Sequence, residues 1–253
     1  MPTLITVEQR AASRPRDYVR VAGADAEDFL QRMVSNDVTA APCQALLLTP
    51  KARVIAPLVV VRRGPEDFLL LTEPGLGEAV RANLLRSRFA AKVEVEPEDH
   101  RSVIVFGKGE GIPNHDYGEP AFEVLDDSLE PTLSAEELER MRIEAGTAAW
   151  GKEIDDRVLP AEAGLTDRAV SFTKGCYPGQ EPIARLHHRG KANRGLRVLA
   201  VEGADVGEEL RLGDKVVGRI TSAANGVALA YVRVEVPEDA ELVTETGKAR
   251  SLH

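Results

Sequence analysis

The character of the sequence changes after Gly195, and this change constrains the fold more than any other feature. Downstream, short segments rich in Val and Leu at 196–201, 215–222 and 227–234 are separated by glycines, which is typical of a small β-barrel or sandwich. Upstream, segments with helical spacing of apolar residues alternate with Leu- and Val-rich segments. The sequence therefore predicts an α+β protein that ends in a β-rich unit.

The upstream part contains three predicted helices and several strands. The spacing predicts helices over 24–34, with Asp25 as a cap, and over 77–88. Ser134 with Glu137 predicts a capping box for a third helix, which stops at Gly146. Strands are predicted at 44–49, 53–62, 67–72, 92–95, 101–106 and 121–125. We divide the chain into residues 1–95, 96–195 and 196–253.

Composition and charge limit the classes of function. The 253 residues carry a net charge of -9, which disfavours non-specific nucleic-acid binding by the molecule as a whole. The two cysteines, Cys43 and Cys176, lie far apart and predict neither a disulfide framework nor a Cys-x-x-Cys metal pair. No stretch approaches the roughly 20 apolar residues that span a bilayer. We expect a cytoplasmic protein that makes no contact with membranes.

The segment from Lys174 to Glu181 contains the main candidate for chemistry. Gly175, Pro178 and Gly179 predict a tight ordered loop that presents the thiol of Cys176. Lys174 and the arginines that follow would favour the thiolate. The candidate catalytic residues are Cys176, Lys174 and Tyr177. The alternative is that Cys176 is a small buried hydrophobe.

Three blocks of sequence resemble the YgfZ family, the folate-binding relatives of glycine-cleavage T-protein that support iron–sulfur proteins. The first block is the octapeptide 174–181. The second is the order Arg142-Ile143-Glu144-Ala145-Gly146, Trp150-Gly151-Lys152-Glu153-Ile154 and Leu159-Pro160-Ala161-Glu162-Ala163-Gly164-Leu165. The third is Gly218-Arg219-Ile220-Thr221-Ser222 with Ala228-Leu229-Ala230-Tyr231-Val232. The resemblance covers most of the chain, from about Gly23 to Val234.

This resemblance implies a T-protein-like fold, with two α+β units and a β-barrel around a central pocket for tetrahydrofolate or a derivative. It implies that Glu144 recognises the pterin ring, whose paired donors suit a carboxylate. A solvent-exposed helix-end glutamate is the alternative. Trp150 would stack on the pterin or serve only in packing. Further candidate folate-binding residues are Gln180, Glu181 and Arg185, and Arg185, Arg189 and Lys191 would attract a polyglutamate tail.

The resemblance also implies a departure from T-protein chemistry. T-proteins carry adjacent aspartates, one of them essential for methylene transfer, in a block that matches 53–60, where this chain has Ala56 and Pro57. Cys176 matches an aspartate of T-proteins. We therefore expect an accessory protein that binds folate and uses Cys176 in assembling or repairing iron–sulfur clusters on client enzymes, including tRNA-modifying ones.

Two other classes of function remain open. The first is a folate-dependent one-carbon transferase on an unknown acceptor, with Tyr177, Glu181 and Glu162 as acid–base candidates. The second is an RNA-binding module, suggested by the basic run 185–197; the lack of interleaved aromatics and the negative total charge weigh against direct nucleic-acid binding. No resident metal is expected, since two cysteines cannot complete a four-thiolate cluster site.

Overall fold

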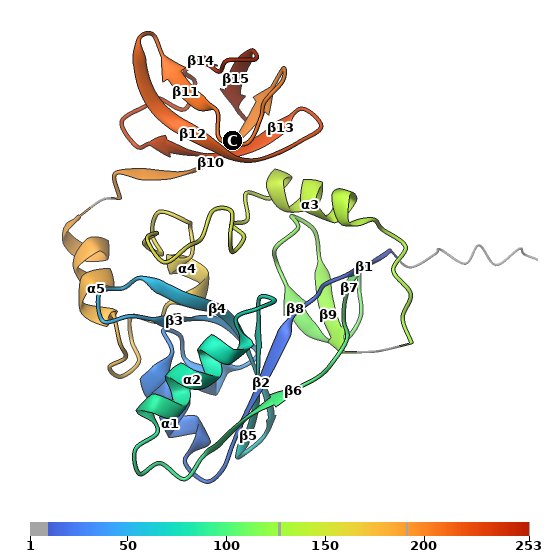
Figure 1. The fold of residues 1–253 in the computed structure, drawn as a ribbon, viewed down its shortest axis with the longest axis vertical. Coiled ribbons are helices and arrows are strands. Elements are labelled where there is room, and N and C mark those ends of the chain that lie inside the picture. Colours follow the sequence, from blue (N-terminus) through green and yellow to red (C-terminus); the bar gives the residue numbers. More distant parts are fainter. Residues whose placement is uncertain (1–9, 126–127, 191, 253) are drawn as a thin grey trace, which may run out of the picture.

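The structure, a computed structural model, describes residues 10–125, 128–190 and 192–252. It consists of two antiparallel sheets, a largely irregular connecting segment and a closed barrel (Figure 1). The α+β prediction and the predicted C-terminal barrel are confirmed. The candidate Lys191 lies outside the described residues.

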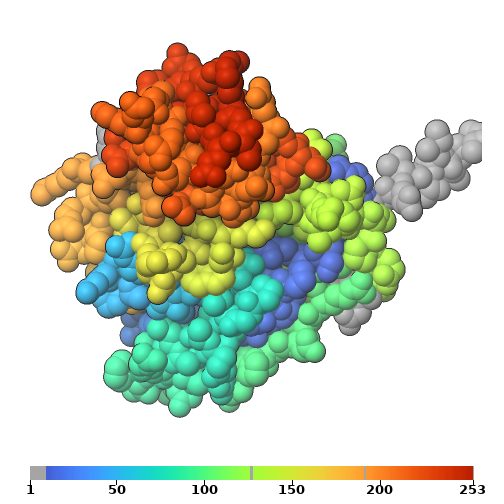
Figure 2. All heavy atoms as spheres, turned by 45° about the horizontal axis from the view of Figure 1, so that its top comes forward, coloured from blue at the N-terminus to red at the C-terminus, as the bar shows by residue number. Residues whose placement is uncertain are grey.

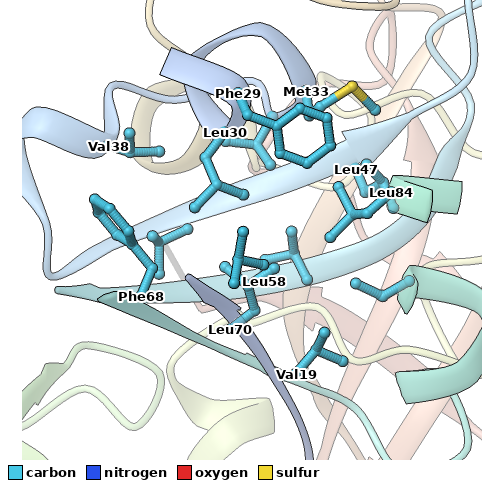
Figure 3. Packing of buried hydrophobic residues seen from close by; sticks show 14 of the residues in the cluster. Val19, Phe29, Leu30, Met33, Val38, Leu47, Leu58, Phe68, Leu70 and Leu84 are labelled. Carbon is cyan, nitrogen blue, oxygen red and sulfur yellow. The ribbon is translucent and has the colours of Figure 1, made fainter. Parts of the chain in front are cut away.

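The first sheet lies at the bottom of Figure 1 and has the strand order β3-β4-β5-β2-β6. Its strands are β2 (Asp17–Ala22), β3 (Cys43–Leu48), β4 (Val54–Gly64), β5 (Asp67–Thr72) and β6 (Glu94–Glu98). Helices α1 (Ala26–Met33) and α2 (Gly77–Ser87) pack on one face, and the short helix η1 (Val38–Ala40) leads into β3. Figure 3 shows Phe29 and Leu30 of α1 packed against Leu58, Phe68 and Leu70 of this sheet.

Both faces of the first sheet are buried, as the residues of β5 show. Phe68 and Leu70 belong to the cluster under the two helices, whereas Leu69 and Leu71 pack with Ile112 on the opposite face. A strand buried on both faces needs a continuous apolar run. The Leu-rich sequence of β5 therefore matches its central position in the first sheet.

The second sheet has the strand order β1-β7-β9-β8. Its strands are β1 (Ala11–Ser13), β7 (Ser102–Phe106), β8 (Ile112–Asn114) and β9 (Ala121–Leu125). Because β1 pairs with β7, the start of the described chain belongs to this sheet even though it precedes the first. Helix α3 (Ala135–Glu144) follows, and its predicted capping box is confirmed by the reciprocal bonds of Ser134 and Glu137.

A mostly irregular segment connects α3 to the barrel. It runs through α4 (Thr166–Ala169) to α5 (Gln180–Arg189), and Figure 2 shows its yellow part as a layer between the barrel and the first sheet. The barrel has the strand order β10-β13-β12-β11-β14-β15. Its strands are β10 (Arg194–Val201), β11 (Glu209–Leu212), β12 (Lys215–Ala224), β13 (Val227–Arg233), β14 (Leu242–Val243) and β15 (Lys248–Ser251).

Several local features differ from the sequence analysis, which did not predict strands β1, β2, β8, β11, β14 and β15. The Asp25 side chain makes no capping bond within α1; it accepts a hydrogen bond from Lys92 N at 2.7 Å and so ties the start of α1 to the segment before β6. The first part of the basic run, up to Arg189, lies in a helix, α5, that the sequence analysis did not predict, and Arg194 and Arg197 lie in β10. Pro182 is tolerated in α5 because it lies in the first turn, where the backbone N–H has no partner within the helix.

Candidate functional site

The Cys176 loop presents the thiol to solvent. Cys176 is exposed, so the alternative in which it is a buried hydrophobe is wrong. Tyr177, the next residue, is buried among the apolar side chains of β3, β4 and the connecting segment. Gly179 has a φ of +84°, and a Cβ there would lie 2.7 Å from Thr49 O. Only glycine allows this close approach, which holds the loop against the turn between β3 and β4.

Lys174 Nζ contacts backbone carbonyls of the first unit. It donates to Val34 O at 2.8 Å and to Asn36 O at 2.7 Å, and it lies 5.4 Å from the centre of the Tyr177 ring. Burial lowers the pKa of Lys174 to about 8, although the charge of Asp37 acts in the opposite direction. Burial raises the pKa of Tyr177 to about 12, so Tyr177 is a neutral phenol at neutral pH.

The second thiol, Cys43, lies near Lys174 in a different environment. It is partly buried, and its Sγ donates to Asp37 O at 3.5 Å. Burial raises the pKa of Cys43 to about 11, partly offset by the charge of Lys174. At pH 8 only about one molecule in a thousand would therefore carry the Cys43 thiolate. Electrophiles are expected to modify the exposed Cys176 first.

A central cavity of about 260 Å³ lies between the two sheets, α3 and the connecting segment. Its wall includes residues 13–16 before β2, 44–46 of β3, 57–59 of β4 and 147–150 after α3. A larger hollow of about 980 Å³ beside β6 is wide open to solvent and contains none of the candidate site residues. The cavity between the units is therefore a better candidate for a small-molecule site than this open hollow.

Charged side chains of both signs line the central cavity. The carboxylates are Glu73, Asp116 and Glu139, and the guanidinium groups are Arg14, Arg16, Arg142 and Arg168. Each carboxylate is paired with an arginine: Glu73 with Arg14 and Arg16, Asp116 with Arg168, and Glu139 with Arg142. Since every one of these carboxylates is engaged in an ion pair, none is a free general base.

A second layer of buried charge supports this wall. Behind the cavity, Glu123 accepts from Arg16 Nε at 2.7 Å and is almost fully buried. Burial is the largest single influence and would lower the pKa of Arg16, but the charge and hydrogen bond of Glu123 together with the charge of Glu73 outweigh it, so the pKa is raised. Arg16 therefore stays charged, and the wall is held rigidly by hydrogen-bonded ion pairs.

The structure brings only some of the predicted site residues to the cavity. Trp150 lines it and is half-buried. Glu144 does not line it; its carboxylate is exposed at the end of α3 and accepts a hydrogen bond from Arg140 Nε at 2.8 Å. Cys176, Lys174 and Tyr177, together with Gln180, Glu181 and Arg185 of α5, also lie outside the cavity lining.

Strand β4 contributes no carboxylate to the cavity. Pro57 lies in the cavity wall, and its carbonyl oxygen accepts a hydrogen bond from Thr72 Oγ1 at 2.8 Å. Ala56, its neighbour, faces the core under the helices. The cavity wall at β4 is therefore apolar, and the carbonyl oxygen of Pro57 is occupied by its hydrogen bond from Thr72.

A separate cavity of about 430 Å³ lies between α5, residues 159–167 and the start of the barrel. Its lining is mainly apolar, and Ala161, Ile183 and Leu186 contribute to it. Within the described ranges, no group of three or more His, Cys, Asp or Glu side chains could hold a metal ion. No helix in the same ranges has the length and apolar character needed to cross a bilayer.

Sequence reasoning missed the four arginines of the central cavity. They come from the β1–β2 connection, α3 and α4, and nothing in their local sequence distinguishes them from surface arginines. Arg14, Arg16 and Arg168 pair with residues far away in the chain, just after β5 and between β8 and β9, and only the tertiary fold brings these pairs together. Arg142 pairs locally, with Glu139 three residues before it on α3.

Comparisons with known proteins bear on the whole chain. No family model matches. The sequence is 27% identical over 241 residues to an uncharacterized protein of Haemophilus influenzae, covering 87% of this chain and 86% of that protein. It is 26% identical over 263 residues to the tRNA-modifying protein YgfZ of Pectobacterium carotovorum, covering 84% of this chain and 76% of that protein. The glycine cleavage system aminomethyltransferase T from Bartonella henselae has a similar fold, with a TM-score of 0.80 and 20% identity over 96% of this chain and 85% of that one.

Proposed function

We propose that this chain, which is a YgfZ-like protein with the T-protein fold, binds tetrahydrofolate or a derivative and supports iron–sulfur client enzymes through Cys176. The single observation that carries the proposal is the central cavity, enclosed by both sheets, α3 and the connecting segment, with an exposed thiol on an adjoining loop. The clients would include enzymes that modify tRNA, as the name of the Pectobacterium relative suggests.

The lining of the cavity matches the chemistry of a folate. A pterin presents a flat ring and a paired donor edge, which suit the indole of Trp150 and a carboxylate acceptor. The glutamate tail of a folate carries carboxylates, which suit guanidinium groups such as Arg14 and Arg168. Because these arginines are held by ion pairs, the site is organised before the ligand arrives.

The same lining argues against a T-protein type of aminomethyl transfer. That chemistry needs an ionisable group at the reacting carbon, and β4 supplies Pro57 at this wall. The carboxylates of the cavity are engaged with arginines, so none is available to take a proton. A one-carbon transferase is therefore the less favoured alternative, and consumption of methylene-tetrahydrofolate with an added amine would support it.

The role of Cys176 follows from its exposure. A thiol on an exposed loop can meet a client protein directly, whereas a thiol inside the cavity would meet only the folate. Two free cysteines persist in a reducing compartment, which is consistent with an intracellular role. We propose that Cys176 is a transient ligand or redox partner for the client, with the folate bound nearby.

Titration with tetrahydrofolate is expected to change the fluorescence of Trp150 to saturation, with one ligand per chain. Trp150 is the only tryptophan of the chain and lines the cavity, so its emission reports on occupancy. The titration is done under argon with selective tryptophan excitation, and isothermal calorimetry gives an independent affinity. Trp150→Phe should lose the fluorescence change but still bind tetrahydrofolate in the calorimeter. If neither the wild type nor Trp150→Phe released or absorbed heat of binding, the folate site would be refuted.

A further inference from the structure

The ammonium group of Lys174 makes its hydrogen bonds to other residues of the protein. Of the three N–H bonds of an ammonium group, one is directed to Val34 O and one to Asn36 O, while the Nζ lies near the face of Tyr177. From the sequence, Lys174 was expected to favour the thiolate of Cys176. The structure instead gives it partners on residues 34–37, which follow α1 and are called the 34–37 segment below.

The 34–37 segment is bonded directly to the wall of the central cavity. Ser35 Oγ donates to Ala169 O at 2.5 Å and accepts from Leu46 N at 2.8 Å. Asn36 Nδ2 donates to Gln44 O at 2.7 Å. Ala169, Leu46 and Gln44 all line the cavity. One layer of hydrogen bonds therefore separates the cavity wall from the carbonyls that Lys174 holds.

The other side of the Cys176 loop is attached to the same strand. Tyr177 is buried against Leu46 and Leu48 of β3, and Gly179 packs on the turn that follows β3. Gly175 and Cys176, the two residues between Lys174 and the buried Tyr177, are exposed. Contacts to β3 and to the 34–37 segment thus determine the position of the thiol. Strand β3 forms part of the cavity wall, and the 34–37 segment is hydrogen-bonded to that wall.

We propose that Lys174 is a positioning residue that couples occupancy of the central cavity to the reactivity of Cys176. The inference rests on the proposed function, since it names how the folate site regulates the thiol. A ligand packed on Leu46 and Ala169 restricts the motion of the 34–37 segment, and through Lys174 it restricts the Cys176 loop. A client would then meet a differently presented thiol in the folate-bound protein.

The test measures the rate at which iodoacetamide alkylates Cys176, followed by mass spectrometry of the separated Cys176 and Cys43 peptides. Saturating tetrahydrofolate is expected to slow alkylation of Cys176 by about fivefold, the low end of typical coupling. Lys174→Met should bind tetrahydrofolate and lose this response, Lys174→Arg should recover part of it, and Lys248→Met, an exposed barrel lysine, should behave as wild type.

A measurement without ligand separates this inference from the folate proposal. Lys174→Met alone is expected to raise the alkylation rate of Cys176 and to speed hydrogen exchange at the amide of Leu46, since the loop and the 34–37 segment lose their shared clamp. Unchanged values for both would overturn the positioning role whatever tetrahydrofolate does. If tetrahydrofolate still slowed alkylation of Cys176 in Lys174→Met, the coupling through Lys174 would be overturned. If calorimetry showed no binding of tetrahydrofolate while Lys174→Met still changed both alkylation and hydrogen exchange, only the folate site would be refuted.

Discussion

Arg142→Met is expected to lower the free energy of unfolding by about 3–5 kcal/mol, because it leaves a buried carboxylate without its charged partner. Arg142 Nη1 donates to Glu153 Oε2 at 2.9 Å, and the Glu153 side chain has an exposure of 0%. Arg142 Nη2 also donates to Ser222 Oγ at 2.8 Å in β12. The guanidinium therefore joins α3, the connecting segment and the barrel.

Chemical denaturation of Arg142→Met and of a matched variant measures this effect. Arg140→Met removes a guanidinium from the same helix, where it makes an exposed ion pair with Glu144. Exposed helix pairs contribute about 0.3–0.5 kcal/mol, so this control should change stability little. Equal losses for the two variants would contradict the structural role that we assign to the buried network.

Cys176→Ser is expected to abolish support of iron–sulfur clients while leaving the fold intact. Serine is close to cysteine in size, and the side chain is exposed, so stability should change by less than about 0.5 kcal/mol. The hydroxyl is neither a thiolate nor a soft metal ligand at neutral pH. The activity of an iron–sulfur tRNA-modifying enzyme, measured in cells that carry only the variant, gives the result.

Cys43→Ser provides the matched control for the thiol. Cys43 is partly buried, and its pKa is raised to about 11, so we assign it no chemistry with clients. Cells with this variant should retain client activity. Full client activity with Cys176→Ser, or an equal loss with Cys43→Ser, would remove Cys176 from the mechanism.

The sequence predicted those elements whose signals are local. The Leu- and Val-rich runs of β4 and β5, the apolar stripe of α1 and the capping box at Ser134 each specify structure within a few residues. Helix α5 was missed because only Ile183 and Leu186 mark its inner face and Pro182 interrupts the pattern. Strands β14 and β15 were missed because they are short and form only as the barrel closes.

The candidate site was predicted only in part. The Cys176 loop could be identified from its glycines and the thiol between them, and the structure shows this thiol exposed. The resemblance implied a central pocket, but the ion pairs of the cavity wall could not be predicted, since they join residues such as Arg14 and Glu73, or Asp116 and Arg168, that have no local relation. The partners of Lys174 are likewise long-range, more than a hundred residues away along the chain.

Calorimetric titration of tetrahydrofolate into two cavity-filling variants tests the central claim most directly. Ala148→Phe places a ring in the central cavity, and Ala161→Phe places the same ring in the separate cavity beside α5. Thermal melting first confirms that both variants are folded. We predict that Ala148→Phe abolishes binding and that Ala161→Phe binds as wild type does; binding retained by Ala148→Phe and lost by Ala161→Phe would contradict a folate site between the two sheets.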